Sequence, residues 1–301
     1  MRRAQATIGR LVQSSRLSRS AQRLDPVHDL ALNYVAGEDV ADAVEVAADL
    51  SRKGLSLCFT RLGVDCDATA ATASLLELLD ALPDARGVDL SVRPSVFGSA
   101  PESREAHGPL VDLCAAAAQR GATVTLEMQG HAHYLDTIRL ARRVLAEVPD
   151  LGVTLPVDIR RAERDAREFA ERGARVRACI GAYPAPTPVA YRSEHEKSLA
   201  FVRVLRVLFA SNARPMVASH DPRIVEIAQE LARRNGRAPD SYEFQMMLGV
   251  RPLEQRRLVD IGLVCRTYVP YGPGWYEHLS NRIAARPRVL WSYARAILDK
   301  R

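Results

Sequence analysis

The residues best suited to chemistry lie near the C-terminal end of the chain, after the segment RTYVPYG. A turn rich in glycine and proline precedes a predicted helix that begins near Trp275. His278, Asn281 and Arg282 then occupy helical positions i, i+3 and i+4, so their side chains share one face. Guanidinium and amide groups donate hydrogen bonds to carboxylates. This polar face after a strand and a turn therefore predicts a site for an anionic substrate.

A short phrase that ends one element and begins the next recurs along the rest of the chain. A helical segment ends in a basic or polar residue, a glycine follows, and a run of β-forming residues comes next. The phrase occurs as RKG-LSLCFT, ARG-VDLSVRP, QRG-ATVTLEM, ERG-ARVRACI and DIG-LVCRTY. Glycine ends a helix there because it adopts the left-handed conformation without penalty. The phrase predicts helices and strands in alternation.

Eight predicted strands, each followed by a predicted helix, account for most of the chain. The strands cover about 55–59, 88–94, 123–128, 153–158, 175–180, 215–220, 242–247 and 264–269. The helices cover 68–82, 109–120, 135–148, 160–172, 194–210, 222–235, 253–261 and 275–286, with apolar residues at three- and four-residue spacing. This alternation predicts an α/β fold, a (β/α)8 TIM-like barrel. A doubly wound open sheet is the second choice, and no G-x-G-x-x-G follows the first strand to favour it.

Barrel enzymes place their chemistry at the C-terminal ends of the strands. The polar side chains that we expect there are rich in arginine: Thr60, Arg61, Arg93, Glu127, Gln129, Asp158, Arg177, Tyr183, His220, Asp221, Gln245, Arg266, Tyr268 and Tyr271. Such a set suits a cofactor phosphate or a carboxylate better than an apolar ligand.

Residues 1–50 predict an N-terminal helical arm, and residues 51–301 predict one barrel domain. Within the arm we expect helices at 8–24, 27–36 and 39–52, the last with Asp39 as its N-cap. The first 24 residues are rich in arginine and serine but lack the apolar core of a secretory signal.

The composition is that of a globular protein, with 47% hydrophobic and 26% charged residues. No apolar run reaches membrane-spanning length. The net charge is +6, but the arginines are interleaved with acids, which argues against a nucleic-acid partner and would permit weak attraction to an anionic membrane. The five cysteines form no CxxC pair, which suits reduced thiols. We expect a cytoplasmic protein, with peripheral association at the inner membrane face left open.

One pair of histidines resembles a metal-binding motif. His131 and His133 form an H-x-H after the third predicted strand, whereas metal-dependent barrel hydrolases carry this motif on the first. We therefore expect no metal site.

Four ordered motifs resemble the FAD-dependent proline dehydrogenase family of the monofunctional bacterial type. VRACIGAY followed by PVAYRS is similar to the family's V-R-L-x-K-G-A-Y, and PMVASHDPRIV is similar to P-M-I-A-T-H-D. YEFQMMLGV is similar to E-F-Q-M-L-x-G, and the C-terminal signature is similar to R-x-Y-x-P-Y-G, W-Y and R-I-A-x-R-P. The segment NYVAGEDVADAV resembles the family's sequence before the barrel.

The resemblance implies an oxidoreductase of proline catabolism, a flavoprotein with FAD across the barrel mouth. Proline would be oxidised to 1-pyrroline-5-carboxylate by hydride transfer to the flavin, with a quinone as electron acceptor. Arg177 would hydrogen-bond the flavin near N5 and His220 would contact the cofactor, and we assign Tyr183 and Gln245 to the same site. The substrate and catalytic residues would be Tyr268, Arg282, Arg93, Glu127, His278 and Asn281.

Several of these positions differ from the family's pattern. Arg93 and Glu127 stand where the family has lysine and aspartate, and His278 and Asn281 stand where it has tyrosine and arginine. A glutamate of the last helix is Ala285, and on the flavin side a lysine is Ile180 and a glutamine is Pro156. Two alternatives therefore stay open: a flavoenzyme for another cyclic amine or amino acid, and a non-catalytic homologue.

Overall fold

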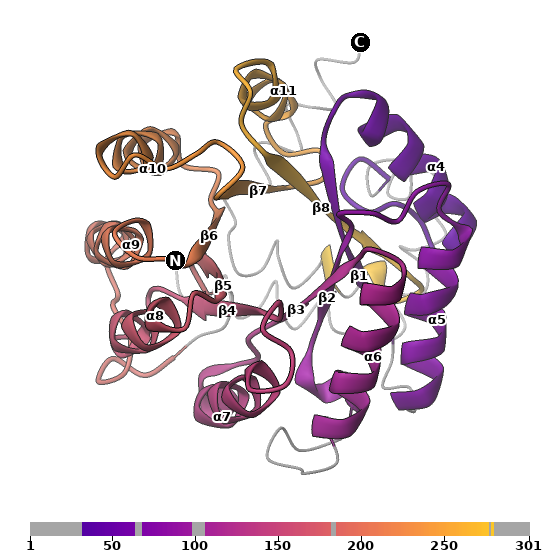
Figure 1. The fold of residues 1–301 in the computed structure, drawn as a ribbon, viewed down its shortest axis with the longest axis horizontal. Coiled ribbons are helices and arrows are strands. Elements are labelled where there is room, and N and C mark those ends of the chain that lie inside the picture. The colour runs from indigo at the N-terminus through magenta and orange to yellow at the C-terminus, as the bar shows by residue number, and fades with distance from the viewer. Residues whose placement is uncertain (1–31, 64–67, 98–105, 182–184, 277, 280–301) are drawn as a thin grey trace, which may run out of the picture.

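Eight parallel strands close into a barrel in chain order, β1 to β8 (Figure 1). The computed structural model describes residues 32–63, 68–97, 106–181, 185–276 and 278–279. The strands are β1 (Ser56–Arg61), β2 (Asp89–Val92), β3 (Thr123–Leu126), β4 (Gly152–Pro156), β5 (Arg175–Cys179), β6 (Arg214–Ala218), β7 (Glu243–Met247) and β8 (Cys265–Tyr271). The predicted (β/α)8 fold is confirmed, and each strand lies within a few residues of its predicted position.

The helices surround the barrel, as Figure 1 shows; α4 precedes β1, and each of the others follows the strand that the sequence predicts. They are α4 (Val40–Arg52), α5 (Ala68–Ala81), α6 (His107–Gln119), α7 (Tyr134–Leu145), α8 (Ala162–Glu171), α9 (Glu194–Phe209), α10 (Pro222–Arg234) and α11 (Pro252–Asp260). The glycine phrase acts as expected. Gly121 and Gly262, for example, end α6 and α11 with φ of 72° and 82°.

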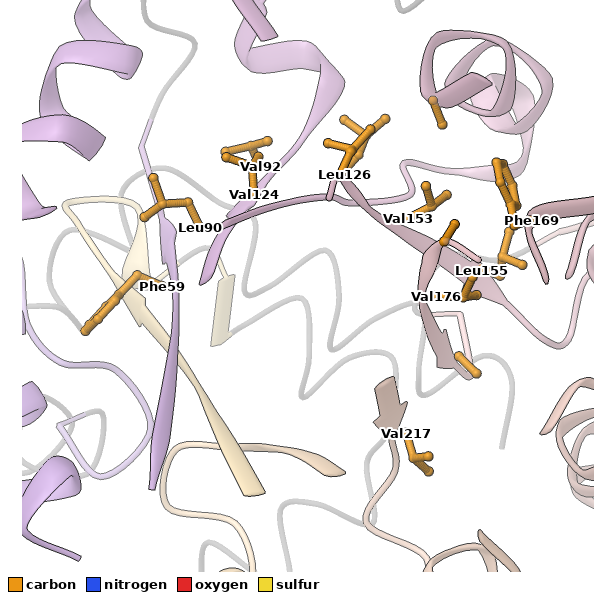
Figure 2. Close-up of a cluster of buried hydrophobic side chains, with 14 of the residues drawn as sticks. Phe59, Leu90, Val92, Val124, Leu126, Val153, Leu155, Phe169, Val176 and Val217 are labelled. Carbon is orange, nitrogen blue, oxygen red and sulfur yellow. The ribbon is translucent and has the colours of Figure 1, made fainter. Parts of the chain in front are cut away.

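The hydrophobic core lies between the strands and the helices (Figure 2). Alternate strand residues point outward because side chains in a strand change face at every position. Leu90 and Val92 of β2 and Val153 and Leu155 of β4 are each at most 2% exposed in this layer. The strand residues at the other alternate positions face the barrel interior.

The segment before the barrel is fixed against its last strand. Asp39 caps α4 as predicted and forms a reciprocal capping box with Asp42. The helix predicted at 27–36 is wrong for its described part, because residues 32–35 form a turn and a bend. The N–H of Ala36 instead donates to the carbonyl of Pro270 on β8, at 2.8 Å, which favours extended backbone.

Some predictions fall on residues outside the described ranges. The helix predicted at 8–24 lies wholly outside, and of the helix predicted at 275–286 only 275, 276, 278 and 279 are described, all helical. The division into an arm and a barrel at residue 50 stays a prediction. None of the helices in the described ranges has both the length and the apolar character to cross a membrane.

The geometry of the turn after β8 predicts that a side chain at Gly272 lowers the stability of the fold. Its φ is +115°, and a Cβ there would lie 2.1 Å from the carbonyl oxygen of Leu62. Gly272→Ala is expected to cost about 2–4 kcal/mol, from strained backbone and a clash with rigid main chain. Urea unfolding measures this loss.

Gly87→Ala is the matched control for that test. Gly87 also has a positive φ, +75°, but an added Cβ would meet nothing within 4 Å. The control is expected to cost about 1 kcal/mol, from backbone conformation alone. Equal losses in the two variants would show that the approach to Leu62 is not a constraint.

Candidate active site

The inner face of the barrel is polar, although barrels of this fold are usually filled by branched apolar residues. Contacts that cross the barrel between strands that are not neighbours place some of these side chains in the interior, and hydrogen bonds to those residues place the others. The interior set includes Cys58, Thr60, Asp89, Ser91, Thr123, Thr125, Arg175, Arg177, Met216, Glu243, Gln245, Arg266 and Tyr268. Burial of polar groups costs free energy unless each group has a hydrogen-bond or ion-pair partner. The partners of these side chains therefore indicate what each of them does.

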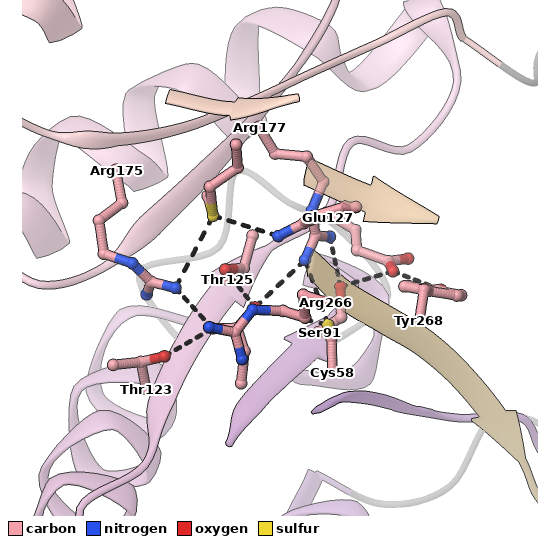
Figure 3. Close-up of polar contacts among 12 residues, drawn as sticks. Cys58, Ser91, Thr123, Thr125, Glu127, Arg175, Arg177, Arg266 and Tyr268 are labelled. Carbon is pink, nitrogen blue, oxygen red and sulfur yellow. Dashed lines mark hydrogen bonds and ion pairs between the residues drawn. The ribbon is translucent and has the colours of Figure 1, made fainter. Parts of the chain in front are cut away.

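Asp89 is the centre of this interior network, and Figure 3 labels its partners Arg175, Arg177 and Thr125. Its carboxylate on β2 lies 3.1 Å from Nη2 of Arg175 and 3.2 Å from Nη2 of Arg177, both on β5 across the barrel. The hydroxyls of Thr123 and Thr125 donate to the same carboxylate at 2.8 and 2.7 Å. Asp89 therefore ties β2, β3 and β5 together with charge-assisted hydrogen bonds.

The surroundings of Asp89 keep it ionised. Complete burial opposes the charge, but the guanidinium groups of Arg175, Arg177 and Arg266 outweigh burial and hold the pKa of Asp89 well below its ordinary value. An ionised carboxylate with two cationic partners is stable in the interior only while those partners remain.

A second ion pair lies on the strands that close the barrel. Nε and Nη2 of Arg266 on β8 both donate to the carboxylate of Glu243 on β7, each at 2.8 Å. Nη1 of Arg266 donates to the carbonyls of Leu57 and Gly87. Arg266 thus has its own carboxylate and joins β8 to the chain near β1 and β2.

A chain of hydrogen bonds leads from Arg177 toward the mouth of the barrel. Nη1 of Arg177 donates to Oγ of Ser91 at 2.6 Å, and Ser91 donates to Oε1 of Glu127 at 2.7 Å. Tyr268 donates its hydroxyl to the same Oε1 at 2.6 Å. Burial and the neighbouring Glu127 raise the pKa of Tyr268 well above its ordinary value, so the phenol stays protonated and can donate.

Arg177 has donor capacity that its protein contacts do not use. Its Nε–H is buried and has no hydrogen-bond partner among the described residues. A buried unpaired donor costs about 1–3 kcal/mol, which a ligand acceptor would relieve. Among the described strands, Asp89 is the ion-pair partner of Arg175 and Arg177, and Glu243 is the partner of Arg266. The interior thus suits a ligand that offers a hydrogen-bond acceptor or a negative charge to Arg177.

The structure brings together three of the residues predicted for the site, and Ser91 joins them. Arg177, Glu127 and Tyr268 belong to one network, with the guanidinium carbon of Arg177 5.9 Å from the centre of the Tyr268 ring. Arg93 follows β2 and is half-buried, and its guanidinium makes no hydrogen bond or ion pair with any described residue, although its carbonyl accepts from the N–H of Val96. It is therefore available to a ligand carboxylate.

Two residues predicted to bind the cofactor make contacts within the protein. Nε2 of His220, after β6, accepts the backbone N–H of Met247 at 3.0 Å, which fixes this ring on β7. Gln245 lies within the barrel, where Nε2 donates to Glu243 and contacts the sulfur of Met216. Their assignment to the cofactor stays a prediction.

The remaining predicted residues are only partly described. His278 is half-buried and helical, and its backbone N–H donates to Gly274 at 3.2 Å. Tyr183, Asn281 and Arg282 lie outside the described residues. Their predicted roles rest on the sequence.

Three residues that we expected at the C-terminal ends of the strands lie elsewhere along their strands. Arg177 and Gln245 lie in the middle of their strands, and Arg266 is the second residue of β8. Their place in the interior follows from closure of the sheet, which turns every second residue inward.

Sequence analysis also missed Asp89, Ser91, Arg175 and Glu243. The available signal was a set of charged residues at alternate positions of apolar strands, as in D-L-S and R-V-R. Buried charges require partners, so this alternation indicates a paired interior network.

The histidines of the H-x-H motif lie in a short 3-10 helix, η3 (His131–His133), where both are exposed. In the part of the chain that the structure describes, no three histidine, cysteine or acidic side chains are grouped as metal ligands would be.

Comparison with known proteins identifies relatives over most of the chain. The sequence model of the family described as "Proline dehydrogenase" matches residues 41–275. Proline dehydrogenase 1 of Bacillus subtilis (strain 168) is 27% identical over 275 residues, which cover 90% of this chain and 91% of that protein. Proline dehydrogenase of Deinococcus radiodurans is 27% identical over 298 residues, with 95% and 94% covered.

Solved structures share the fold. Proline utilization A (PutA) from Bdellovibrio bacteriovorus, inactivated by N-propargylglycine, matches with a TM-score of 0.77 and 18% identity over 85% of this chain and 32% of that one. PutA from Corynebacterium freiburgense matches with a TM-score of 0.72 and 20% identity, with 98% and 34% covered. This chain spans about a third of the length of these two proteins.

The ionised state of Asp89 predicts how stability depends on pH. Its folded pKa is depressed below the unfolded value of about 3.9, so its contribution is complete above that value and is lost as pH falls toward the folded pKa. Asp89→Asn is expected to cost about 3–5 kcal/mol, because two arginines lose their buried counterion.

Urea unfolding at several pH values tests this prediction. The gap between wild type and Asp89→Asn is expected to stay constant from about pH 5 to 8 and to shrink below about pH 4. Asp80→Asn is the control, because Asp80 pairs with Arg120 at the surface and its loss is expected to matter much less. A gap that widens as pH falls below 4 would contradict the assignment.

Proposed function

The chain belongs to the proline dehydrogenase family, and we propose that it is an FAD-dependent enzyme that oxidises L-proline to 1-pyrroline-5-carboxylate and passes the electrons to a quinone. The observation that carries this proposal is the Nε–H of Arg177, which is buried and has no hydrogen-bond partner among the described residues. Arg177 belongs to the motif that is similar to the family's flavin-binding segment.

The residues of the mouth fit a bound flavin. Arg177 would hold it with the Nε–H donor, and His220, Tyr183 and Gln245 are assigned to the same cofactor. When bound, the flavin accepts the two electrons of the C5–N oxidation and delivers them to the quinone. The protein's part is to bind both partners, orient them and exclude water.

Side chains around the Arg177 network would form the substrate site. The paired hydroxyl of Tyr268 and carboxylate of Glu127 give one wall a fixed orientation, because each is held by a short hydrogen bond. Arg93 and Arg282 would hold the substrate carboxylate, with His278 and Asn281 on the same helix face as Arg282. Two guanidinium groups from different elements would define the position of the carboxylate.

A second candidate is a flavoenzyme for another cyclic amine or amino acid. The observation in its favour is that Arg93, Glu127, His278 and Asn281 together replace four residues of the family's pattern. A panel of L-proline, hydroxyproline and other cyclic amines with a dye acceptor separates the two candidates. A non-catalytic homologue, to which Ile180 and Pro156 point, would bind no flavin or turn over none of the panel.

The flavin proposal predicts that Arg177→Lys weakens FAD binding. Lysine keeps the positive charge opposite Asp89 but cannot supply the Nε–H and both Nη contacts together. Loss of one charge-assisted hydrogen bond, about 1.5–3 kcal/mol, is expected to raise the Kd for FAD roughly tenfold to a hundredfold. Titration of flavin-stripped protein, followed by absorbance and flavin fluorescence, measures the change.

Arg214→Lys is the control, since Arg214 is exposed at the start of β6. It is expected to leave the Kd unchanged. Wild-type protein that stays colourless with excess FAD would overturn the proposed function. Equal Kd values for wild type and Arg177→Lys would remove Arg177 from the cofactor site.

The altered carboxylate site predicts weak binding of L-proline. Asparagine offers two neutral donors where guanidinium offers five donors and a full charge. Asn281→Arg is therefore expected to lower KM for L-proline roughly tenfold to a hundredfold, the equivalent of about 1.5–3 kcal/mol. Steady-state kinetics with the substrate panel measures this change.

Asn235→Arg adds the same charge on the exposed surface after α10 and is expected to leave KM unchanged. If Asn281→Arg fails to improve proline kinetics and another panel member loses out, the pocket is built for that other substrate. Arg93 then becomes the principal carboxylate ligand to test.

A further inference from the structure

The guanidinium of Arg177 is held from one side only. Its terminal nitrogens contact Asp89, Ser91 and Cys58, all on β1 and β2, at 2.6 to 3.3 Å. These contacts fix the plane of the group and leave Nε–H, buried and unpartnered among the described residues. The orientation of the Arg177 Nε–H therefore depends on residues of β1 and β2.

Asp89 neutralises Arg177 incompletely because it is shared. Arg175 lies as close to its carboxylate as Arg177 does, 3.1 against 3.2 Å, and Thr123 and Thr125 occupy further lone pairs. The other buried carboxylate, Glu243, makes both its ion-pair contacts to Arg266. Asp89 therefore offsets the Arg177 charge only in part, and the more distant carboxylate of Glu127, which Arg177 reaches through Ser91, adds to that offset.

We propose that Asp89 is a positioning residue that aims the Nε–H of Arg177 at the bound flavin and, by partly offsetting the Arg177 charge, sets the reduction potential of that flavin. The proposal rests on the proposed function, since it requires a flavin at the mouth. Positive charge beside a flavin favours its electron-rich reduced form, and the protein tunes a flavin through such charges. Asp89 acts through Arg177 and needs no contact with the cofactor.

Because two arginines share the Asp89 carboxylate, two substitutions are expected to shift the flavin reduction potential in opposite directions. Asp89→Asn removes the counterion, so Arg177 acts with its full charge and the potential is expected to rise. Arg175→Met removes the competing cation, so Asp89 serves Arg177 alone and the potential is expected to fall. Arg175→Met leaves Asp89 with Arg177 and two threonines, and this arm stays informative if Asp89→Asn does not fold.

Glu243→Gln is the matched control for Asp89→Asn. Each variant replaces one buried carboxylate with its amide, so each removes one negative charge from the barrel and is expected to destabilise the fold. They differ in the arginines that lose a partner: Arg266 for Glu243, and Arg177 together with Arg175 for Asp89. A change in potential confined to Asp89→Asn cannot follow from lost stability alone.

The experiment is a spectroelectrochemical titration of FAD-loaded wild type, Asp89→Asn, Arg175→Met and Glu243→Gln, each as the whole chain. Asp89→Asn is expected to favour reduced over oxidised flavin at least tenfold relative to wild type, a rise of about 30 mV for a two-electron couple. Arg175→Met is expected to shift the potential by a similar amount downward. Glu243→Gln is expected to shift it by less than about a third of that value.

The outcomes separate the two proposals. A wild-type protein that binds no flavin overturns the proposed function and this inference with it. A flavin-loaded wild type whose potential moves no more in Asp89→Asn than in Glu243→Gln overturns the inference alone. An unchanged or raised potential in Arg175→Met does the same.

Discussion

The structure depends on one buried carboxylate that holds two arginines inside a closed barrel. Asp89 bridges β2 to Arg175 and Arg177 of β5, across the barrel axis, and the hydroxyls of β3 complete its hydrogen bonding. Removal of Asp89 leaves Arg175 and Arg177 without their buried counterion. The arrangement therefore makes the position of Arg177 a consequence of barrel closure, and a group so placed can act on a ligand with little rearrangement.

Stability and function are divided between the two faces of the same strands. Outward residues such as Leu90 and Val92 bury apolar surface against the helices, which accounts for the hydrophobic driving force. Inward residues carry charges and hydroxyls that a purely structural barrel would replace with branched apolar side chains. Because the outward residues stabilise the fold, the inward residues can include buried charges, although their desolvation costs free energy.

The network also connects the two halves of the proposed reaction site. Ser91 accepts from Arg177 and donates to Glu127, which accepts from Tyr268, so the cofactor side and the substrate side share one line of hydrogen bonds. A change in the length of one side chain would be felt along that line. Glu127, which stands where the family has aspartate, is the point at which the two sides meet on this line.

The sequence by itself determined the barrel, the order of its elements and the family, because glycine-terminated helices and alternating strands are local patterns. Its motifs also predicted Arg177, Glu127 and Tyr268 as site residues, and these three share one network; their roles, like those of Asn281 and Arg282, stay predictions. Only the tertiary structure decided which charges meet. Asp89 and Arg177 are 88 residues apart and on strands that are not neighbours, and no local pattern encodes a contact made through the centre of a closed sheet.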